Sequence, residues 1–380
     1  MTWNPVLPGP WNGSGVELRE MRLPSIALVA PSLESIGGQG TQAHTLATQL
    51  QKEGYAVSFI PIEPCFPPGL RWVRRYPYAR TLLNQSFYLP SLLRLRRADV
   101  AHVFSASYWS FLLAPVPAIL AARGFGKRIV LHYHSGEAED HLAKWGALVH
   151  PWLRLVDETV VPSVYLRNVF TRHGYRARVI PNVADTSRFR YRERSPLRPH
   201  LLSTRNLESF YRVDNTLEAF ALLKARYPEA ILTIAGYGSE ESQLRRLAAS
   251  LGSDGIRFVG RVPPDDIPGL YEEADIFVNS SIVDNQPVSV LEAFASGLPV
   301  VSTGTGDIAN MVRDGATGLL VPPDDPAAIV KAVTSLLEDP DRALHIVRRA
   351  RQEVEQYTWT QVREAWAAVY LKRSAPNSGL

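Results

Sequence analysis

The 380-residue sequence has a single cysteine, Cys65, so it cannot form an internal disulfide, which suits a reducing compartment. It contains neither a P-loop motif nor zinc-type spacing of Cys and His. Its most apolar stretch, residues 103–122, is broken by serines and two prolines, so it lacks the run of about 20 apolar residues that a membrane helix needs. Residues 1–20 lack the basic start and apolar core of a secretion signal, and their composition predicts a disordered tail. These absences favour a cytoplasmic protein.

Acidic residues are absent from residues 71–97, although the formal net charge of the whole chain is only +4. This stretch holds seven arginines, interleaved with leucines and with several aromatic residues. Two interpretations are open: a solvated arginine-rich surface, or a face that meets anionic lipid headgroups or another anionic partner. The second would make the protein peripheral at the inner face of a membrane. Nucleic acid is not expected as a partner, because no recognition motif accompanies the arginines.

Short apolar runs alternate with helical patterns from about residue 25 onward. The clearest helix is predicted for residues 40–53, where Leu46 and Leu50 share one face and Gly54 follows as a stop. Strand and helix in alternation predict an α/β fold with doubly wound parallel sheets. Strands are predicted at residues 25–31, 56–61, 101–106, 128–134, 158–163 and 178–182, and then at 201–206, 230–236, 256–261, 275–281, 299–303 and 318–322.

One charged segment with two prolines and no apolar period interrupts this alternation and predicts a linker. In open parallel sheets, ligands bind at the carboxyl ends of the strands. Two such sheets that face each other predict a cleft lined by strand-end loops from both. The predicted divisions are a tail (1–20), a first α/β domain (21–185), the linker (186–198), a second α/β domain (199–355) and a helical segment (356–380).

Two features of the first domain fall at predicted strand ends. Gly37 and Gly38 let the backbone pass close to a ligand, and the helix that follows them offers free N–H groups to phosphate. His132 and His134 end the fourth strand, and we expect them to point to opposite faces, one packed and one presented to the cleft. Taken alone, either feature is more often structural than functional.

The second domain places two arginines after its first strand. Arg205 ends the strand and Arg212 follows in the next turn, and each offers a planar fork of donors suited to phosphate oxygens. A surface salt bridge is the commoner role of such an arginine taken alone. The segment AGYGSEE, residues 235–241, has two glycines of a dinucleotide fingerprint but lacks the third, so it predicts a tight strand-to-helix turn.

The segment SIVDNQPVSVLEAFASGLPVVST is the most specific feature. Pro287 suits the first turn of a helix, so the amides around Val288 and Ser289 can receive a diphosphate. Glu292 lies in the next turn, where its carboxylate can accept hydrogen bonds from paired hydroxyls such as those of a ribose. Asp284, in the preceding loop, can reach another part of the same ligand. A capped helix with two solvated acids is the structural alternative, but it does not explain the spacing of those acids.

Three ordered blocks, residues 37–57, 160–189 and 288–321, resemble the glycine loop, the interdomain signature and the donor-site signature of glycosyltransferase family 4. The resemblance covers nearly everything from residue 21 to about residue 373. It implies a GT-B fold: two facing Rossmann-like domains with a cleft between them and C-terminal helices that cross back to the first domain. It also implies that the first domain binds the acceptor and that the second binds the donor.

The resemblance implies roles for individual residues of the cleft. His134 and Asp284 would be catalytic and would contact the transferred sugar. Within the donor site, Arg205 would bind the phosphates, Glu292 the ribose hydroxyls and Val262 the base. The full set of implied donor-binding residues is Gly37, Gly38, Arg205, Arg212, Val262, Pro287, Val288, Ser289 and Glu292.

The chain departs from the family pattern at two positions. Asp284 stands where the family usually has glutamate, which is one methylene longer. Tyr211 stands near the place of a family lysine, and Arg212 is a candidate for the missing positive charge. These departures are the only support for an alternative in which the protein binds nucleotide sugars without catalysis. A nucleotide-sugar epimerase on the same fold is a third possibility, although the signatures favour a transferase.

The activity implied by the resemblance is retaining transfer of a hexose or N-acetylhexosamine from a nucleotide sugar. The expected acceptor is a glycan, a lipid-linked glycan or a polysaccharide precursor. Neither a metal nor a cofactor is expected, since the nucleotide sugar is itself a substrate. Peripheral contact with an anionic membrane is compatible with the arginine-rich residues 71–97.

Overall fold

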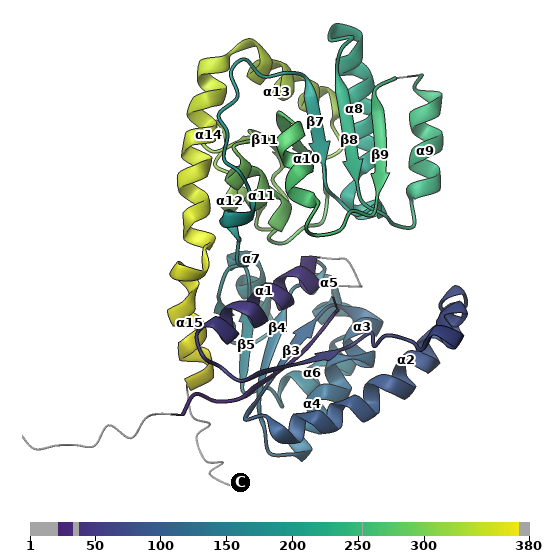
Figure 1. Ribbon diagram of the computed structural model, residues 1–380, viewed down its shortest axis with the longest axis vertical. Coiled ribbons are helices and arrows are strands. Elements are labelled where there is room, and N and C mark those ends of the chain that lie inside the picture. Colours follow the sequence, from purple (N-terminus) through teal and green to yellow (C-terminus); the bar gives the residue numbers. More distant parts are fainter. Residues whose placement is uncertain (1–21, 33–37, 253, 372–380) are drawn as a thin grey trace, which may run out of the picture.

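The computed structural model describes residues 22–32, 38–252 and 254–371 of the chain. The predicted tail and Gly37 therefore lie outside the described residues. Figure 1 shows two α/β domains, one above the other, with a column of helices along one side.

The first domain is built on a six-stranded parallel sheet in the order β2-β1-β3-β4-β5-β6. Its inner strands are buried along their whole length: all residues of β1, β3 and β4 are buried. Helices cover both faces of such a sheet, which is why its strands appear in the sequence as continuous apolar runs. The strands are β1 (Ile26–Ala30), β2 (Val57–Pro61), β3 (Val100–Ser105), β4 (Arg128–Tyr133), β5 (Glu158–Val161) and β6 (Arg178–Val179).

The helices of the first domain connect these strands. They are α1 (Gly38–Lys52), α2 (Pro77–Ser91), α3 (Tyr108–Leu113), α4 (Pro115–Gly124), α5 (Ala138–Lys144), α6 (Gly146–Leu153) and α7 (Val164–Arg172). Short 3-10 segments, Pro68–Arg75 and Leu92–Arg97, flank α2. Helix α1 begins two residues before the predicted start and buries Leu46 and Leu50, as expected.

The second domain repeats the plan with a parallel sheet in the order β12-β11-β10-β7-β8-β9. In both sheets the chain moves outward in one direction and then returns to the other side of the starting strand, which creates a switch point between two inner strands. In the second sheet this point lies between β7 and β10. The strands are β7 (His200–Ser203), β8 (Ile231–Ala235), β9 (Ile256–Gly260), β10 (Ile276–Asn279), β11 (Val300–Thr303) and β12 (Leu319–Val321).

The helices of the second half of the chain end with α14 and α15, which run along one side of the molecule (Figure 1). They are α8 (Val213–Arg226), α9 (Glu241–Ser250), α10 (Ile267–Glu273), α11 (Val288–Ser296), α12 (Ile308–Met311), α13 (Pro326–Glu338), α14 (Pro340–Val354) and α15 (Trp359–Leu371).

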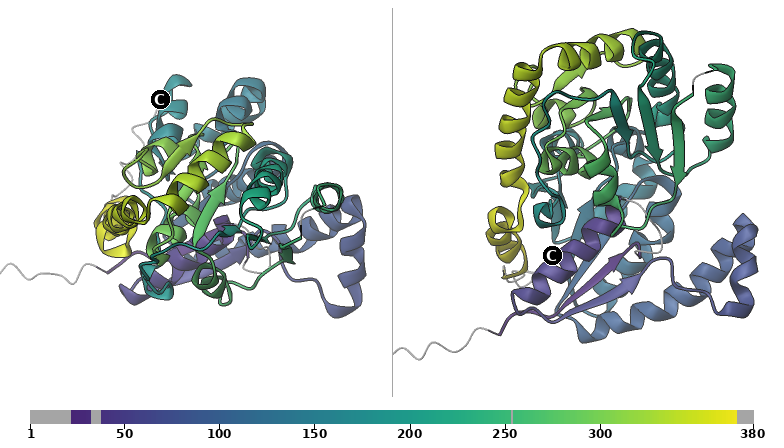
Figure 2. Two further views of the ribbon diagram at one scale, coloured as in Figure 1. Left: turned by 90° about the horizontal axis from the view of Figure 1, so that it is seen from above. Right: turned by 45° about the horizontal axis from the view of Figure 1, so that its top comes forward.

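Helix α14 packs on the second domain, and α15 returns to the first. Figures 1 and 2 show the pair as a yellow column that spans both domains. Val362, Trp366, Val369 and Tyr370 of α15 recur at helical spacing and are buried in the same core cluster as β1 and α1. The structure thus confirms the expected crossing back of the C-terminal helices.

The segment predicted as a linker is packed against the second domain. Arg194 is buried, and its Nη1 donates to the carbonyl oxygen of Ser296 at 2.9 Å. Its Nη2 donates to the carbonyl oxygen of Tyr271 at 2.8 Å. The guanidinium of Arg194 therefore binds backbone carbonyl groups of the second domain.

Every predicted strand is present, and each of the twelve begins within one residue of its expected start. Some end earlier than predicted, and β6 and β7 each end three residues early. None of the helices in the described part of the chain has the length and apolar character needed to cross a bilayer.

Candidate active site

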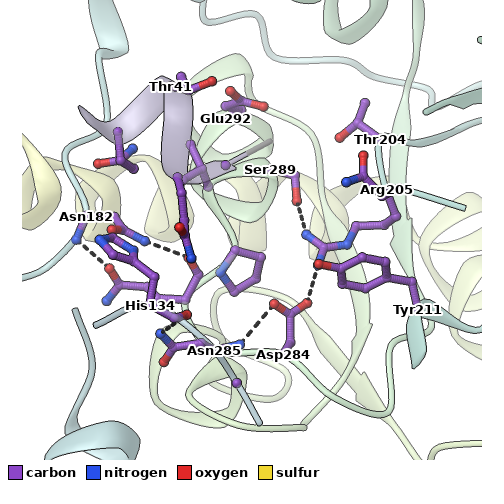
Figure 3. Close-up of a pocket in the computed structure, with 18 of the residues that line it drawn as sticks. Thr41, His134, Asn182, Thr204, Arg205, Tyr211, Asp284, Asn285, Ser289 and Glu292 are labelled. Carbon is purple, nitrogen blue, oxygen red and sulfur yellow. Dashed lines mark hydrogen bonds and ion pairs between the residues drawn. The ribbon is translucent and has the colours of Figure 1, made fainter. Parts of the chain in front are cut away.

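A cavity of about 370 Å³ lies between the two domains, where strand-end loops of both sheets meet. From the second domain it is lined by the loops after β7 and β10, which flank the switch point of that sheet, and by the first turn of α11. From the first domain it is lined by the start of α1 and the loop after β4. This is the position at which doubly wound folds bind ligands. Figure 3 shows the convergence of polar side chains from both domains.

Arg205, directly after β7, is the central cation of the cavity (Figure 3). Its Nη2 donates to Asp284 Oδ2 at 2.7 Å, and its Nη1 donates to Ser289 Oγ at 3.2 Å. The guanidinium carbon lies 4.1 Å from the centre of the Tyr211 ring. These contacts use two of the five donors of a guanidinium and hold its plane in place, so the remaining donors are oriented in advance.

Glu292 points into the cavity from α11, one turn after the helix begins. Its Oε2 accepts a hydrogen bond of 2.8 Å from the hydroxyl of Tyr271 in α10. The same hydroxyl lies 2.9 Å from Thr204 Oγ1, at the end of β7. Burial raises the pKa of Glu292 above its ordinary value, and the Tyr271 hydrogen bond acts in the opposite direction. This carboxylate retains acceptor capacity toward the cavity.

The first turn of α11 opens on the cavity at Pro287, Val288 and Ser289. Pro287 occupies the cap position and brings no side-chain hydrogen bond to the turn. The first amides of a helix have no partner inside the helix, and the helix dipole favours an anion at this end. The turn, together with Arg205, therefore forms a corner of the cavity that suits an anion.

Glycines let the backbone of the site pass very close to its neighbours. A Cβ on Gly236, in the turn after β8, would lie 2.1 Å from the carbonyl oxygen of Arg205. A Cβ on Gly306 would lie 1.9 Å from the carbonyl oxygen of Asp284, and the φ of Gly306 is +59°. The AGYGSEE segment is thus a strand-to-helix turn, as predicted, whose glycine supports the Arg205 loop.

His134 lines the cavity, but the prediction about the two histidines was wrong. His132 and His134 lie on the same face of the sheet, with ring centres 4.1 Å apart. Side chains alternate along a strand with a period of two, so residues i and i+2 share a face. His102 of β3 extends the row: its ring lies 5.3 Å from that of His132, and its Nδ1 is 2.7 Å from the hydroxyl of Tyr370 in α15.

We expect the free energy of unfolding to decrease as the pH falls below about 6.5, where an unfolded histidine titrates. Burial lowers the pKa of His102 to about 3 and also lowers that of His132. Between these values the unfolded chain binds protons that the folded chain excludes. Stability is therefore full above the unfolded pKa and falls by about 1.4 kcal/mol per pH unit for each such histidine.

Chemical denaturation between about pH 7 and pH 5 measures this slope. His132→Phe, which keeps an aromatic ring but cannot titrate, should reduce it. His345→Phe is the matched control, because His345 is exposed on α14. Equal slopes in the wild type and in His132→Phe would contradict the expectation.

Two residues that the sequence did not single out join the domains beside the cavity. Gln286 Oε1 accepts from the backbone N–H of Asn182 at 2.6 Å, and the Gln286 carbonyl accepts from Asn182 Nδ2 at 2.9 Å. Asn285 Nδ2 donates to the carbonyl oxygen of His134 at 3.2 Å. Their only signal in the sequence is the polar run VDNQP, which fills a loop between strand and helix.

The other predicted residues divide into those inside the cavity and those away from it. Gly38 and Val262 line it. Arg212 does not: its guanidinium donates hydrogen bonds to Asp214, in the first turn of α8, and to Asp324, in the loop before α13. Its backbone has the left-handed conformation (φ 47°). Its proposed replacement of the family lysine is not supported by this geometry, and Tyr211 occupies that wall instead.

Comparison with known proteins agrees with this architecture. The family described as "Glycosyltransferase Family 4" matches residues 36–188, and the family described as "Glycosyl transferases group 1" matches residues 187–353. A GDP-mannose-dependent alpha-(1-6)-phosphatidylinositol monomannoside mannosyltransferase of Mycolicibacterium smegmatis is 32% identical over 340 residues, which cover 82% of this chain and 86% of that protein. A glycogen synthase of Mycobacterium tuberculosis is 32% identical over 298 residues, covering 72% and 69% respectively.

Solved structures show the same fold at lower identity. The Anabaena protein HepE, in complex with UDP and glucose, has a TM-score of 0.70 with 16% identity, covering 92% of this chain and 100% of that one. Sucrose-phosphate synthase from Thermosynechococcus elongatus has a TM-score of 0.68 with 18% identity, covering 91% and 98%. The chain is therefore a glycosyltransferase that takes its sugar from a nucleotide-sugar donor, and it belongs to glycosyltransferase family 4, with the GT-B fold.

Proposed function

We propose that the protein transfers a hexose or N-acetylhexosamine from a nucleoside-diphosphate sugar to its acceptor with retention of configuration, without a metal and without a resident cofactor. One observation carries the proposal most directly. Arg205, the open first turn of α11 and the Glu292 carboxylate all line one cavity between the domains. A cation with free N–H groups suits a diphosphate, and a carboxylate one turn further along suits paired hydroxyls.

The donor would lie along the second domain. In this arrangement the diphosphate sits at Arg205 and the amides of Val288 and Ser289. The ribose hydroxyls donate to Glu292, and the base reaches backbone groups near Val262. This order places the sugar toward the first domain.

The transferred sugar would then lie between Asp284 and His134. Asp284 is held by Arg205, so its carboxylate has a fixed direction. His134 is fixed through its carbonyl oxygen, which accepts from Asn285. Gly38, at the start of α1, leaves room for the diphosphate or the acceptor, because a Cβ there would meet no atom within 4 Å.

Chemistry at this site requires a leaving group that can accept charge. As the bond to the sugar breaks, negative charge grows on the departing nucleoside diphosphate and positive character grows on the sugar ring. Preoriented donors at the diphosphate lower the barrier without any rearrangement during the reaction. Arg205 and the helix amides can supply this stabilisation, which is the basis for proposing metal independence. Attack by the acceptor on the sugar from the face that the leaving group vacates would retain the configuration.

The proposed acceptor is a glycan, a lipid-linked glycan or a polysaccharide precursor, in line with relatives named for glycogen synthesis and for mannosylation of a phosphatidylinositol mannoside. We also propose peripheral contact with an anionic membrane and no contact with nucleic acid. A nucleotide-sugar binder without activity is the competing function, because Asp284 is a shortened acid and Tyr211 replaces a lysine.

A thermal-shift panel of UDP-, GDP- and ADP-sugars tests the proposal. A ligand that binds only the folded protein raises its melting temperature, by an amount equivalent to about 2.7 kcal/mol at a hundredfold excess over Kd. We expect one nucleotide class to stand out, with the same shift in the presence of EDTA. A shift that EDTA abolishes would overturn metal independence. A nucleotide sugar that binds but is neither hydrolysed nor transferred by the purified protein would favour the competing function, binding without activity. No shift in melting temperature with any nucleotide sugar would contradict the donor site.

A further inference from the structure

Arg188 is a second arginine at the cavity between the domains, and the donor arrangement proposed above gives it no role. It ends the short 3-10 segment Thr186–Arg188, at the start of the connection between the two domains. Its side chain is half-buried and lines the cavity. The contacts of this guanidinium indicate which end of a bound donor it would face.

The guanidinium of Arg188 is bonded to the loop that follows β9. Its Nη2 donates to the carbonyl oxygen of Pro264. Val262, Pro264 and Ile267 line the cavity at this loop, and none of the three has a polar side chain. The bond to Pro264 uses one of the five N–H donors of a guanidinium, so others remain for a ligand. Arg188 is therefore a held hydrogen-bond donor beside an apolar wall.

Arg188 and Arg205 approach Glu292 from different walls of the cavity. Arg205 follows β7 and donates to Asp284 at 2.7 Å, whereas Arg188 is bonded to the loop after β9, which is the edge strand of the sheet. Burial raises the pKa of Glu292, and the charges of both arginines oppose that rise. A donor with its diphosphate at Arg205 and its ribose at Glu292 would therefore direct its base toward Arg188.

A much smaller cavity, of about 20 Å³, adjoins the large one at Arg188. Arg188, Glu292 and Thr41 of α1 line both cavities. A space of this size holds about one water molecule and excludes a nucleobase. The base of a bound donor would therefore end against the guanidinium of Arg188.

A guanidinium distinguishes the nucleobases by hydrogen bonding, because it offers donors and no acceptor. Uracil presents a carbonyl oxygen to such a group, and guanine presents the acceptors O6 and N7. Adenine presents an amino group beside its N7, so a donor would face a donor and one of them would stay unpaired. The side chains of Asn and Gln, which have both a donor and an acceptor, are the usual partners of adenine.

We propose that Arg188 contacts the base of the donor and selects uracil or guanine, whose carbonyl oxygens accept hydrogen bonds, against adenine. The proposal rests on the proposed glycosyltransferase function and narrows its donor to a UDP-sugar or a GDP-sugar. Arg205 and Glu292 keep their places at the diphosphate and the ribose, so Arg188 determines specificity without touching the reacting sugar.

Isothermal titration calorimetry of the full chain with UDP, GDP and ADP tests the selection. The wild type should bind UDP or GDP more tightly than ADP by roughly tenfold or more, the scale of one mismatched base contact. Arg188→Gln should weaken binding of the favoured nucleotide by roughly tenfold and leave that of ADP unchanged or tighter, because an amide can pair with adenine. The affinity for inorganic pyrophosphate, which has neither ribose nor base, should not change.

Two further variants control for folding and for charge. Arg190→Gln is the matched control, because Arg190 lies two residues further along, is 79% exposed and pairs with Glu272 at 3.4 Å. It should leave all four affinities unchanged. Arg188→Lys also offers only donors, so it should keep the order of the three nucleotides at lower affinity. The melting temperature of each variant without ligand shows whether it is folded.

The outcomes separate this proposal from the proposed function. Equal losses for UDP, GDP and ADP in Arg188→Gln, or a loss for pyrophosphate, would place Arg188 at the ribose or the diphosphate and overturn base selection. A wild type that binds ADP as tightly as UDP and GDP would overturn the selection while leaving the donor site intact. A wild type that binds none of the three nucleotides would contradict the proposed function itself.

Discussion

Arg205→Ala is expected to weaken binding of the nucleoside diphosphate by roughly 10- to 100-fold. A hydrogen bond to a charged group contributes about 1.5–3 kcal/mol, and each 1.4 kcal/mol is a factor of ten in affinity. Arg205 is also held in place before the ligand arrives, by Asp284 at 2.7 Å and by the ring of Tyr211. Isothermal titration calorimetry with the diphosphate that the thermal-shift panel selects measures the loss.

The controls follow from the contacts of the two arginines. Arg212→Ala should leave the affinity unchanged, because Arg212 is paired with Asp214 and Asp324 outside the cavity. The affinity of Arg205→Lys for the diphosphate should be intermediate, because lysine keeps the charge but lacks the planar fork of guanidinium donors. If Arg212→Ala lost affinity for the diphosphate and Arg205→Ala kept it, Arg212 rather than Arg205 would be the arginine that binds the phosphates.

Arg205→Ala also affects stability, because it leaves a buried carboxylate without its partner. The side chains of Arg205 and Asp284 are 10% and 8% exposed. Removing one member of a buried ion pair costs roughly 3–5 kcal/mol of stability. The double variant Arg205→Ala, Asp284→Asn should recover part of this loss without regaining affinity, so the melting temperature distinguishes a folding effect from a binding effect.

The fold could be predicted from the sequence because parallel strands covered on both faces are continuous apolar runs. Strand β1, IALVA, is buried at every position, and β3 and β4 follow the same rule. The glycines and the proline of the donor-site segment were equally visible, because each has a local backbone role.

Contacts that depend on tertiary packing could not be predicted in this way. Asn182 and Gln286 are 104 residues apart in the chain, and neither belongs to a periodic pattern. Tyr271 resembles any other apolar position of a helix, yet its hydroxyl reaches Glu292. The position of Arg212 depends on a left-handed backbone conformation, which a residue other than glycine rarely adopts. The wrong prediction for His132 and His134 did not depend on tertiary packing, because strand periodicity alone places both side chains on one face of the sheet.

Asp284→Asn is expected to lower turnover by roughly 100-fold, the scale of losing one preorganised electrostatic group at a reacting centre. In the proposed donor arrangement the carboxylate would face the sugar as it gains positive character, and an amide cannot stabilise that charge. The structure adds a second effect. Because Asp284 is the ion-pair partner of Arg205, its neutralisation should also weaken diphosphate binding, although by less than Arg205→Ala does. Steady-state kinetics with varied donor concentration separates the two effects.

Glu292→Gln is the contrasting variant, and Asp284→Glu tests the length of the acid. Gln can still accept the hydrogen bond from Tyr271. The proposed ribose contact would be the same in the ground state and the transition state. Glu292→Gln should therefore raise KM for the donor and change kcat little.

Asp284→Glu adds one methylene at a side chain that is 8% exposed and already 2.7 Å from Arg205, so the longer acid must displace the guanidinium and slow the enzyme. A neutral or faster Asp284→Glu would show that the pocket also accommodates the usual family residue. Full activity in both amide variants would refute the donor-site assignment of this segment.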